Sequence, residues 1–455
     1  MQRQGYASNH RISRNPAHGL NLSKSQCSGM ELAVGPLHRP ANARPTRKDP
    51  MYDLLKNKLE GLQGEMVAFA QELLRTRSRS GDESKTAALV VDQMHALAFD
   101  DVSTDELGNV VGILRGVEEG PTLMLASHMD TVGTGNLATW DESPWSGRIE
   151  NGRLHGLGAA DCKGGLAAQV FAAGLLKRSL LPLRGNLVVA ATVLEENGIS
   201  IGMRGLISHT LKDMGLVPDY AVLGEPTDLG LYYGHDGRAE MEITVRGINP
   251  FRVSDAAELV SRALDDSSHE AAVQDIVVGE TVYEDGPGFR QAVIALERRL
   301  GSNDEVNHLV TRMRGEAVRA ASSIGAVDVE VAVRERNEVM PSGLVVNAKR
   351  ITQAWSTDPF SPLLSRARQA LSAAGCEVRP GRWKLARLGM GTAGSLLVNE
   401  HNIPTIGYGP GHEEQAHREG ESVAISKLVT CTHGTAAIAH GLVGIPVFGW
   451  IPDSL

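Results

Sequence analysis

Histidine and carboxylate side chains follow three apolar runs of the sequence, at the point where each run ends. His128 and Asp130 follow the first run, Glu195 and Glu196 the second, and Glu225 the third. In an open α/β sheet, side chains at the carboxyl ends of neighbouring strands converge on a ligand. We therefore expect these groups to lie close together and to bind a cation.

The adjacent carboxylates Glu195 and Glu196 repel each other, which costs stability unless a cation or solvent relieves the repulsion. A division of labour explains the pair: Glu196 binds a metal ion, and Glu195 stays free as the general base for a water molecule. Asp130 lies two residues after His128. Its carboxylate can therefore orient the imidazole, or support the metal ligands without binding the metal ion itself.

Asp161 lies in a glycine-rich turn, Gly156–Gly165, immediately before a predicted helix. An N-cap role and a phosphate-binding loop are the alternatives. The sequence lacks the Gly-x-x-x-x-Gly-Lys-Ser/Thr pattern of a phosphate loop, and a central carboxylate would repel a phosphate. We therefore interpret Asp161 as a metal ligand that can bridge two ions.

A second histidine comes late in the chain, where His412 and His417 compete for the role. Two histidines with aspartate and glutamate form a mixed nitrogen and oxygen ligand set. Such a set suits Zn²⁺, with Co²⁺ or Mn²⁺ as substitutes.

The segments SHMDTV, GLGAADCKGG, LEEN, GEPT and GPGHEEQAHREGES, in this order, resemble a metallopeptidase family. The family includes aminoacylase, acetylornithine deacetylase, succinyl-diaminopimelate desuccinylase and the glutamate carboxypeptidases. The resemblance covers roughly residues 52–445, and five ordered motifs make it specific.

The resemblance implies a centre of two zinc ions. His128 and Glu225 would bind one ion, Glu196 and His417 the other, and Asp161 would bridge them. In the family, the last ligand follows an alanine and precedes an acidic residue by a few positions. Ala416 and Glu421 match this context around His417, which favours His417 over His412.

The resemblance also assigns the groups around the metal ions. Asp130 would orient His128, and Glu195 would be the general base.

The elements that must position these residues alternate between strand and helix. Apolar residues recur every three or four positions over 55–73, as an amphipathic helix requires. Predicted strands lie at 122–126, 187–194 and 220–223, with a helix at 164–177. This pattern predicts an α/β fold with a mostly parallel sheet and helices on both faces.

The pattern changes between residues 237 and 345, where alternating segments flank amphipathic ones. We expect an inserted α+β lid there, between two parts of the catalytic domain at 51–236 and 346–455. Residues 1–50 carry eight Lys or Arg against two acids, and we expect a disordered basic extension.

Lids of the resembled family commonly form homodimers and carry a histidine that polarises the substrate carbonyl. Here Phe251 occupies the position expected for that histidine. His235 is a candidate replacement, with a structural role as the alternative. Arg298, Arg299 and Arg387 are candidate anchors for a substrate carboxylate.

Composition excludes several other classes of protein. The net charge of −9 disfavours nucleic-acid binding, and no apolar stretch is long enough to cross a membrane. Four widely spaced cysteines give no disulfide framework, which favours the cytoplasm.

The expected function is zinc-dependent hydrolysis of a linear amide in a small N-acyl amino acid or a peptide, as in a deacylase or a carboxypeptidase. One alternative is a dinuclear aminopeptidase or dipeptidase, which would bind a free α-amine. The other is a non-catalytic relative that binds amino-acid-like ligands, but binding alone does not explain the additional Glu195.

Overall fold

The computed structural model describes residues 50–196, 200–269, 276–302, 304–339, 343, 345–383 and 391–446. The extension predicted for residues 1–50 lies outside this part of the chain, apart from Pro50. Helix α1 (Pro50–Arg75) begins there and buries the apolar face expected from its periodicity, including Leu55, Leu59 and Leu73.

A large sheet dominates the residues on either side of the predicted lid. Its nine strands in the described residues have the order β1-β2-β6-β3-β7-β18-β8-β16, and β17 also pairs with β8. The centre, β6-β3-β7-β18, is parallel, whereas the edge pairs β1/β2 and β16/β8 are antiparallel. The strands are β1 (Asp101–Thr104), β2 (Val110–Arg115), β3 (Glu118–His128), β6 (Arg184–Thr192), β7 (Tyr220–Leu223), β8 (Leu231–His235), β16 (Trp355–Ser356), β17 (Pro380–Trp383) and β18 (Thr405–Gly407).

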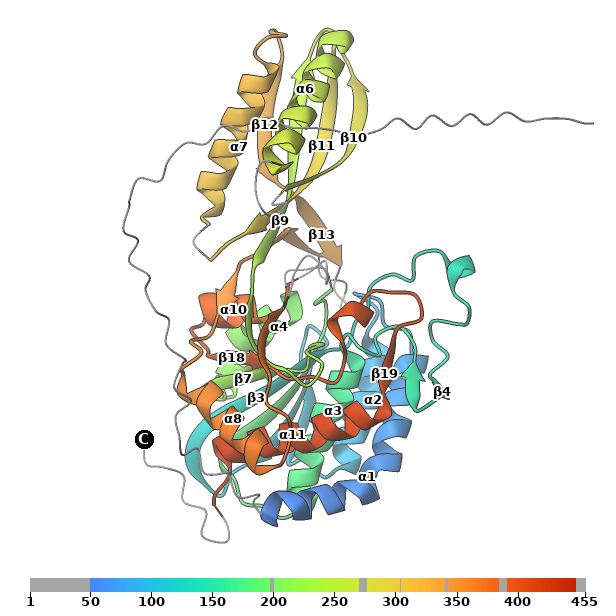
Figure 1. The fold of residues 1–455 in the computed structure, drawn as a ribbon, viewed down its shortest axis with the longest axis vertical. Coiled ribbons are helices and arrows are strands. Elements are labelled where there is room, and N and C mark those ends of the chain that lie inside the picture. The colour runs from blue at the N-terminus through green and yellow to red at the C-terminus, as the bar shows by residue number, and fades with distance from the viewer. Residues whose placement is uncertain are drawn as a thin grey trace, which may run out of the picture. The chain divides into compact units, whose positions relative to one another are not determined.

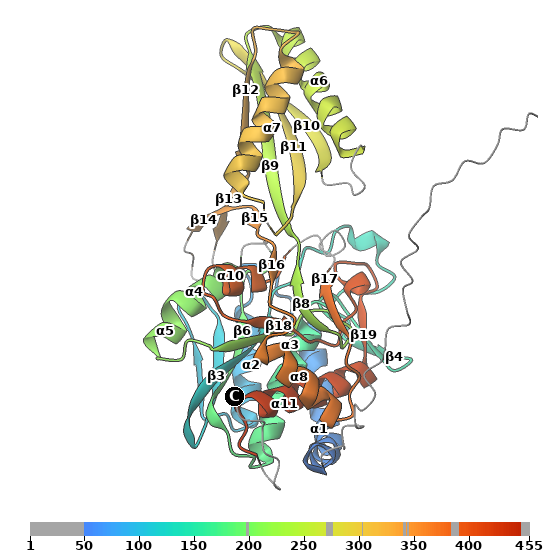
Figure 2. The same cartoon turned by 60° about the vertical axis from the view of Figure 1, so that its left-hand side comes forward.

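Helices cover both faces of this sheet, as expected for parallel strands that are apolar on both sides. One face packs against α1, α2 (Ser84–Ala96), α3 (Lys163–Arg178), α8 (Pro362–Ala373) and α11 (Ile425–Val443). The other packs against the continuous stretch α4 (Ile201–Gly205), η2 (Leu206–Thr210) and α5 (Leu211–Asp213), together with α10 (Gly394–Asn399). Figure 2 shows α4 and α10 on the opposite side of the sheet from α8 and α11.

A second sheet has its own apolar core. Among the described residues it contains β9 (Gly237–Gly247), β10 (Ile276–Gly286), β11 (Phe289–Leu300), β12 (Asp328–Val333) and β15 (Ile351–Thr352). Helices α6 (Pro250–His269) and α7 (Val306–Ala321) lie side by side against it (Figure 1). Its core includes Ile243, Val260, Ile294 and Met313, and is separate from the cores of the large sheet.

Smaller elements complete the described part of the chain. They are the pair β13 (Glu335–Val339) and β14 (Val345–Lys349), the three-stranded sheet β4 (Arg148–Glu150), β5 (Arg153–His155) and β19 (Ser422–Ala424), and the short helices η1 (Leu137–Thr139) and η3 (Glu413–Gln415). Among the described helices, none is both long and apolar enough to span a bilayer.

Candidate active site and metal centre

Strand register brings the predicted site residues to one edge of the large sheet. His128 at the end of β3 pairs with Thr192 at the end of β6, and Ala126 pairs with Leu223 at the end of β7. Because these strands are parallel, the segments that follow them leave the same edge. The chain therefore delivers Glu195 and Glu225 to the side of the sheet where His128 lies.

Asp161 lies between the two predicted histidine ligands. Its Oδ1 is 3.2 Å from Nε2 of His128, and its Oδ2 is 3.3 Å from Nε2 of His417. Nε2 of His417 is also 3.0 Å from Oε2 of Glu196. Each oxygen of one carboxylate thus faces a different histidine, which is the arrangement expected of a residue that bridges two ions.

Two overlapping groups of donor atoms result, and Asp161 belongs to both. Within each group, one atom from every residue lies within 4.8 Å of the others. The first group contains His128, Asp161, Cys162 and Glu225, and the second contains Asp161, Glu196 and His417. The structure thus brings together all five residues predicted as ligands.

Cys162 is the member that sequence reasoning missed. The four cysteines form no metal-binding spacing pattern, so none drew attention as a ligand. The available signal was its position directly after Asp161 in the glycine-rich turn.

The buried carboxylates of this cluster fit divalent cations. Burial raises the pKa of Glu225 well above its ordinary value, and repulsion from Asp161 adds to the rise. Burial would lower the pKa of His417, but the neighbouring Glu196 and Asp161 raise it to about 11. The negative charge of neighbouring carboxylates contributes to both shifts, and a divalent cation would offset that charge.

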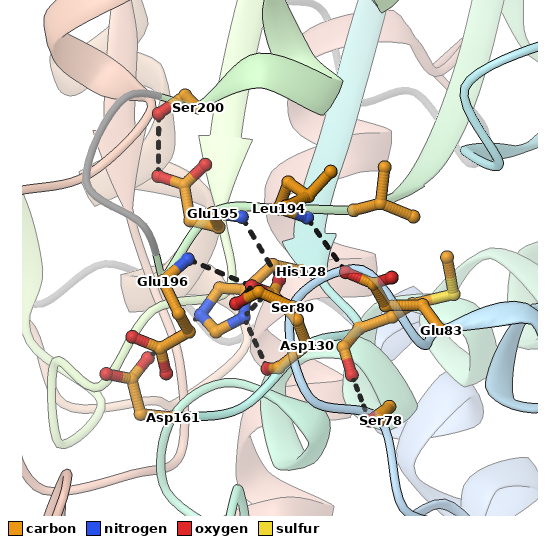
Figure 3. A network of polar contacts seen from close by, with 12 residues as sticks. Ser78, Ser80, Glu83, His128, Asp130, Asp161, Leu194, Glu195, Glu196 and Ser200 are labelled. Carbon is orange, nitrogen blue, oxygen red and sulfur yellow. Dashed lines mark hydrogen bonds and ion pairs between the residues drawn. The ribbon is translucent and has the colours of Figure 1, made fainter. Parts of the chain in front are cut away.

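Asp130 connects the strand end of His128 to the loop that follows β6. Its Oδ1 accepts the backbone N–H of Glu195 at 3.1 Å, and its Oδ2 accepts the N–H of Glu196 at 3.0 Å and the Ser80 hydroxyl at 2.8 Å. Figure 3 shows these contacts converging on Asp130. Nδ1 of His128 lies 2.9 Å from the backbone oxygen of Asp130 and 3.5 Å from its Oδ1. The backbone oxygen therefore makes the shorter contact with the imidazole.

Glu195 lies beside the donor groups, outside both of them, and its two carboxylate oxygens differ. Oε1 accepts a hydrogen bond from the Ser200 hydroxyl at 2.8 Å, whereas the buried Oε2 has no hydrogen-bond partner in the described part of the chain. Burial raises the pKa of this carboxyl to about 8, against the opposing influence of His128 and Ser200. The arrangement leaves one oxygen available for a proton.

A buried carboxylate shapes the turn that presents Asp161. Glu421 accepts the backbone N–H groups of Gly158, Ala160 and Asp161 at 2.9, 2.7 and 3.0 Å. Three bonds to one side chain fix the conformation of a turn that glycines would otherwise leave loose. In the sequence, Glu421 indicated only the choice of His417. Its role in the turn left no local pattern, because its hydrogen-bond partners lie more than 250 positions earlier in the chain.

The connection between α1 and α2 supplies further support that the sequence did not indicate. Ser78 donates to the backbone oxygen of Met129 at 2.7 Å, and Glu83 Oε1 accepts the N–H of Leu194 at 3.1 Å. Glu83 is fully buried, and burial together with repulsion from Asp130 raises its pKa to about 7. These contacts brace β3 and the loop after β6 from one side (Figure 3).

The alternative ligand His412 does not join the cluster. Its side chain is exposed, and its Nδ1 accepts the backbone N–H of Glu414 at 3.1 Å.

The candidate replacement His235 has both ring nitrogens engaged. Nε2 accepts the N–H of Thr392 at 2.9 Å, and Nδ1 lies 2.7 Å from the backbone oxygen of Asp236. Burial lowers the pKa of this imidazole to about 4. These contacts fit the structural alternative better than a catalytic one.

The sequence also singles out Phe251, Arg299 and Arg387 in connection with substrate contact. Phe251 is 79% exposed on the first turn of α6. Arg299 forms an ion pair with Asp236, and Arg387 lies outside the described residues.

The α/β fold and the His and carboxylate cluster define a metal-dependent hydrolase. The model of peptidase family M20/M25/M40 matches residues 124–440, and the chain belongs to this family.

Curated relatives extend the similarity beyond that match. Over 413 residues the chain is 27% identical to the protein called "Uncharacterized protein YgeY" from Escherichia coli (strain K12), covering 86% of this chain and 98% of that one. Succinyl-diaminopimelate desuccinylase from Xanthobacter autotrophicus is 34% identical over 191 residues, covering 40% of this chain and 50% of the relative.

Solved structures share the fold at low sequence identity. Human carnosine dipeptidase 1 superposes with a TM-score of 0.66 at 13% identity, covering 86% of this chain and 98% of that chain. A tripeptidase from Staphylococcus aureus gives a TM-score of 0.64 at 20% identity, covering 83% and 97%. The predicted fold class and family are thus confirmed.

Proposed function

We propose that the chain hydrolyses a linear amide bond of a small N-acyl amino acid or a carboxypeptidase-type peptide substrate, with Glu195 as the general base. The observation that carries this proposal is the position of Glu195, which is buried beside both donor groups yet belongs to neither. A binding protein would have no use for a spare buried carboxylate, because burying such a group costs stability.

The donor set favours two zinc ions. His128, Asp161 and Glu225 would hold one ion, and Asp161, Glu196 and His417 would hold the other. When bound, the ions supply Lewis acidity toward the scissile carbonyl and lower the pKa of the attacking water. Zn²⁺ accepts nitrogen and oxygen ligands together, and Co²⁺ or Mn²⁺ can substitute.

Glu195 moves the proton in this mechanism. The Ser200 hydroxyl fixes Oε1, so Oε2 is the oxygen that takes a proton from the attacking water. The same oxygen then returns the proton to the leaving amine. Asp130 positions both this base and His128, because it holds the backbone N–H of Glu195 and lies against the imidazole.

A hydrolysis panel tests the proposal. The zinc-loaded protein is assayed with N-acetyl, N-succinyl and N-carbamoyl amino acids, and with dipeptides that carry a free or a blocked α-amine. Release of amine from N-acyl amino acids, or from peptides with a blocked α-amine, supports the proposal. Cleavage restricted to peptides with a free α-amine would instead establish an aminopeptidase or dipeptidase, and no hydrolysis at all would favour a non-catalytic relative.

The lid, 237–345, is proposed as a separate homodimerisation domain. Its separate core supports a domain, although β15 extends its sheet past residue 345. Strand β10 pairs only with β11 among the described residues and exposes Val277, Val282 and Tyr283. An exposed apolar edge strand is a natural place for a second copy to pair.

The cytoplasm remains the proposed location, since Cys162, Cys376 and Cys431 form no disulfide.

A further inference from the structure

We propose that Cys162 supplies a thiolate ligand to the metal ion held by His128, Asp161 and Glu225. This half of the centre would then combine nitrogen, oxygen and sulfur ligands, whereas the other half has nitrogen and oxygen alone. The inference rests on the metal centre of the proposed function and adds a ligand to it.

The distances within the first donor group permit a common ion. One donor atom from each of the four residues, Sγ of Cys162 included, lies within 4.8 Å of the others. In a tetrahedral site with ligand atoms at ~2.0–2.3 Å from one zinc ion, these atoms lie about 3.3–3.8 Å apart. Donor atoms within 4.8 Å of one another therefore have to draw together by no more than about 1.5 Å to hold one ion.

The backbone on both sides of Cys162 is held in place. The N–H of Asp161 is bound by Glu421, and the Cys162 carbonyl accepts the N–H of Leu166 at 2.9 Å as α3 begins. The residue is fully buried. The turn that carries the thiol is thus held by hydrogen bonds, and hydrogen bonds to ligand residues orient the ligands of other metal sites in the same way.

The comparison with Cys431 separates a ligand from an ordinary core cysteine. Both residues are fully buried and free. Sγ of Cys431 lies 3.9 Å from the backbone oxygen of Tyr408 and 3.8 Å from the Thr435 hydroxyl, which are neutral groups. Cys162 also has a neutral partner, the Ser127 hydroxyl, but its thiol lies among an imidazole and two carboxylates that together form a metal-binding group, and Cys431 has no such neighbours among the contacts given for it.

A sulfur ligand would change which metal ions this half of the centre prefers. A divalent ion displaces the proton of a coordinating thiol. Thiolates favour Zn²⁺ and other soft ions over Mg²⁺ and Mn²⁺. We therefore expect the Cys162 side to select zinc more strongly than the side formed by Glu196 and His417.

Cobalt spectroscopy tests this ligand directly. The metal-free protein is titrated with Co²⁺, and visible d–d bands report that the ion has bound. A thiolate ligand adds a sulfur-to-cobalt charge-transfer band in the near ultraviolet. The wild type and Cys431→Ser should show this band, and Cys162→Ser should lose it while it keeps the visible bands.

Each outcome decides a separate point. Visible bands without the charge-transfer band in the wild type, or a charge-transfer band that survives Cys162→Ser, would overturn the sulfur ligand but leave the metal centre. No cobalt binding at all would overturn the metal centre and the proposed function with it.

X-ray absorption on the zinc-loaded wild type needs no variant. It should show a sulfur shell at ~2.3 Å. A spectrum with only nitrogen and oxygen neighbours would contradict the inference.

Discussion

The carboxylate of Asp130 accepts the backbone N–H of Glu195 at 3.1 Å, and the same oxygen lies 3.5 Å from Nδ1 of His128. One side chain thus fixes the distance between a proposed metal ligand and the proposed general base. The two residues reach this position from different strands, so their relative placement depends on Asp130.

Replacing Asp130 with Asn tests this coupling. If the amide NH₂ takes the place of one acceptor oxygen, it meets backbone N–H groups and at least one of the present hydrogen bonds is lost. We expect metal affinity or kcat/KM to fall 10–100-fold, the usual effect of losing a group that orients a ligand. Chelator competition and steady-state kinetics measure both. Asp101→Asn, in an exposed ion pair with Arg115, is the control, and an equal effect there would count against the coupling.

Replacing Glu195 with Gln removes the proton acceptor but keeps an oxygen for the Ser200 hydroxyl. We expect kcat to fall by ~10²–10⁴ while metal content is unchanged, because a general base contributes about that much. Metal analysis and kinetics on the same preparation give both values. If the variant kept most of its activity, the base would have to be another residue.

Metal removal should destabilise the protein, since Asp161, Glu196 and Glu225 are buried carboxylates close together. Zinc at a thousand times its Kd would contribute ~4 kcal/mol to the free energy of unfolding. Thermal unfolding with and without chelator measures the loss. His417→Ala should shrink the zinc-dependent shift, and His412→Ala should preserve it. Equal shifts in the two variants would remove His417 from the ligand set.

Glu83 should make stability depend on pH. Its folded pKa is raised from 4.5 to about 7, so the folded protein holds more protons than the unfolded chain between these values. The contribution of Glu83 to the free energy of unfolding therefore falls as pH rises from about 4.5 to about 7, by up to ~3 kcal/mol.

Glu83→Gln tests this dependence, because glutamine keeps an acceptor for the N–H of Leu194. We expect the variant to lose this part of the pH dependence and to be the more stable protein at neutral pH. Urea unfolding of the chelated protein at several pH values measures it. A variant that follows the wild-type pH curve would refute this role of Glu83.

Strand ends and helix periodicity were predictable from the sequence because they depend on neighbouring residues. The helix predicted over 55–73 is α1, and the apolar runs before His128 and Glu225 are parallel strands, β3 and β7. Four of the proposed ligands could be selected because each follows such a run or lies in a distinctive turn, whereas the resemblance to the family was needed to choose His417 over His412.

Other features depend on contacts between distant segments and left no local pattern. Strand β10 is mostly exposed, so it lacks the alternation that marks a half-buried strand, and the sequence did not indicate it. Nothing in the sequence indicated that Glu83 or Glu421 supports the site, because only the fold buries them against backbone N–H groups. Cys162 is similar, because only the fold brings His128 and Glu225 beside it.

Anomalous diffraction from crystals of the zinc-loaded protein tests the central claim most directly. We predict two zinc peaks on either side of Asp161, one within coordinating distance of His128 and Glu225 and the other within reach of Glu196 and His417. Glu195 should coordinate neither ion. Zinc bound away from these residues, or Glu195 found as a ligand, would contradict the account.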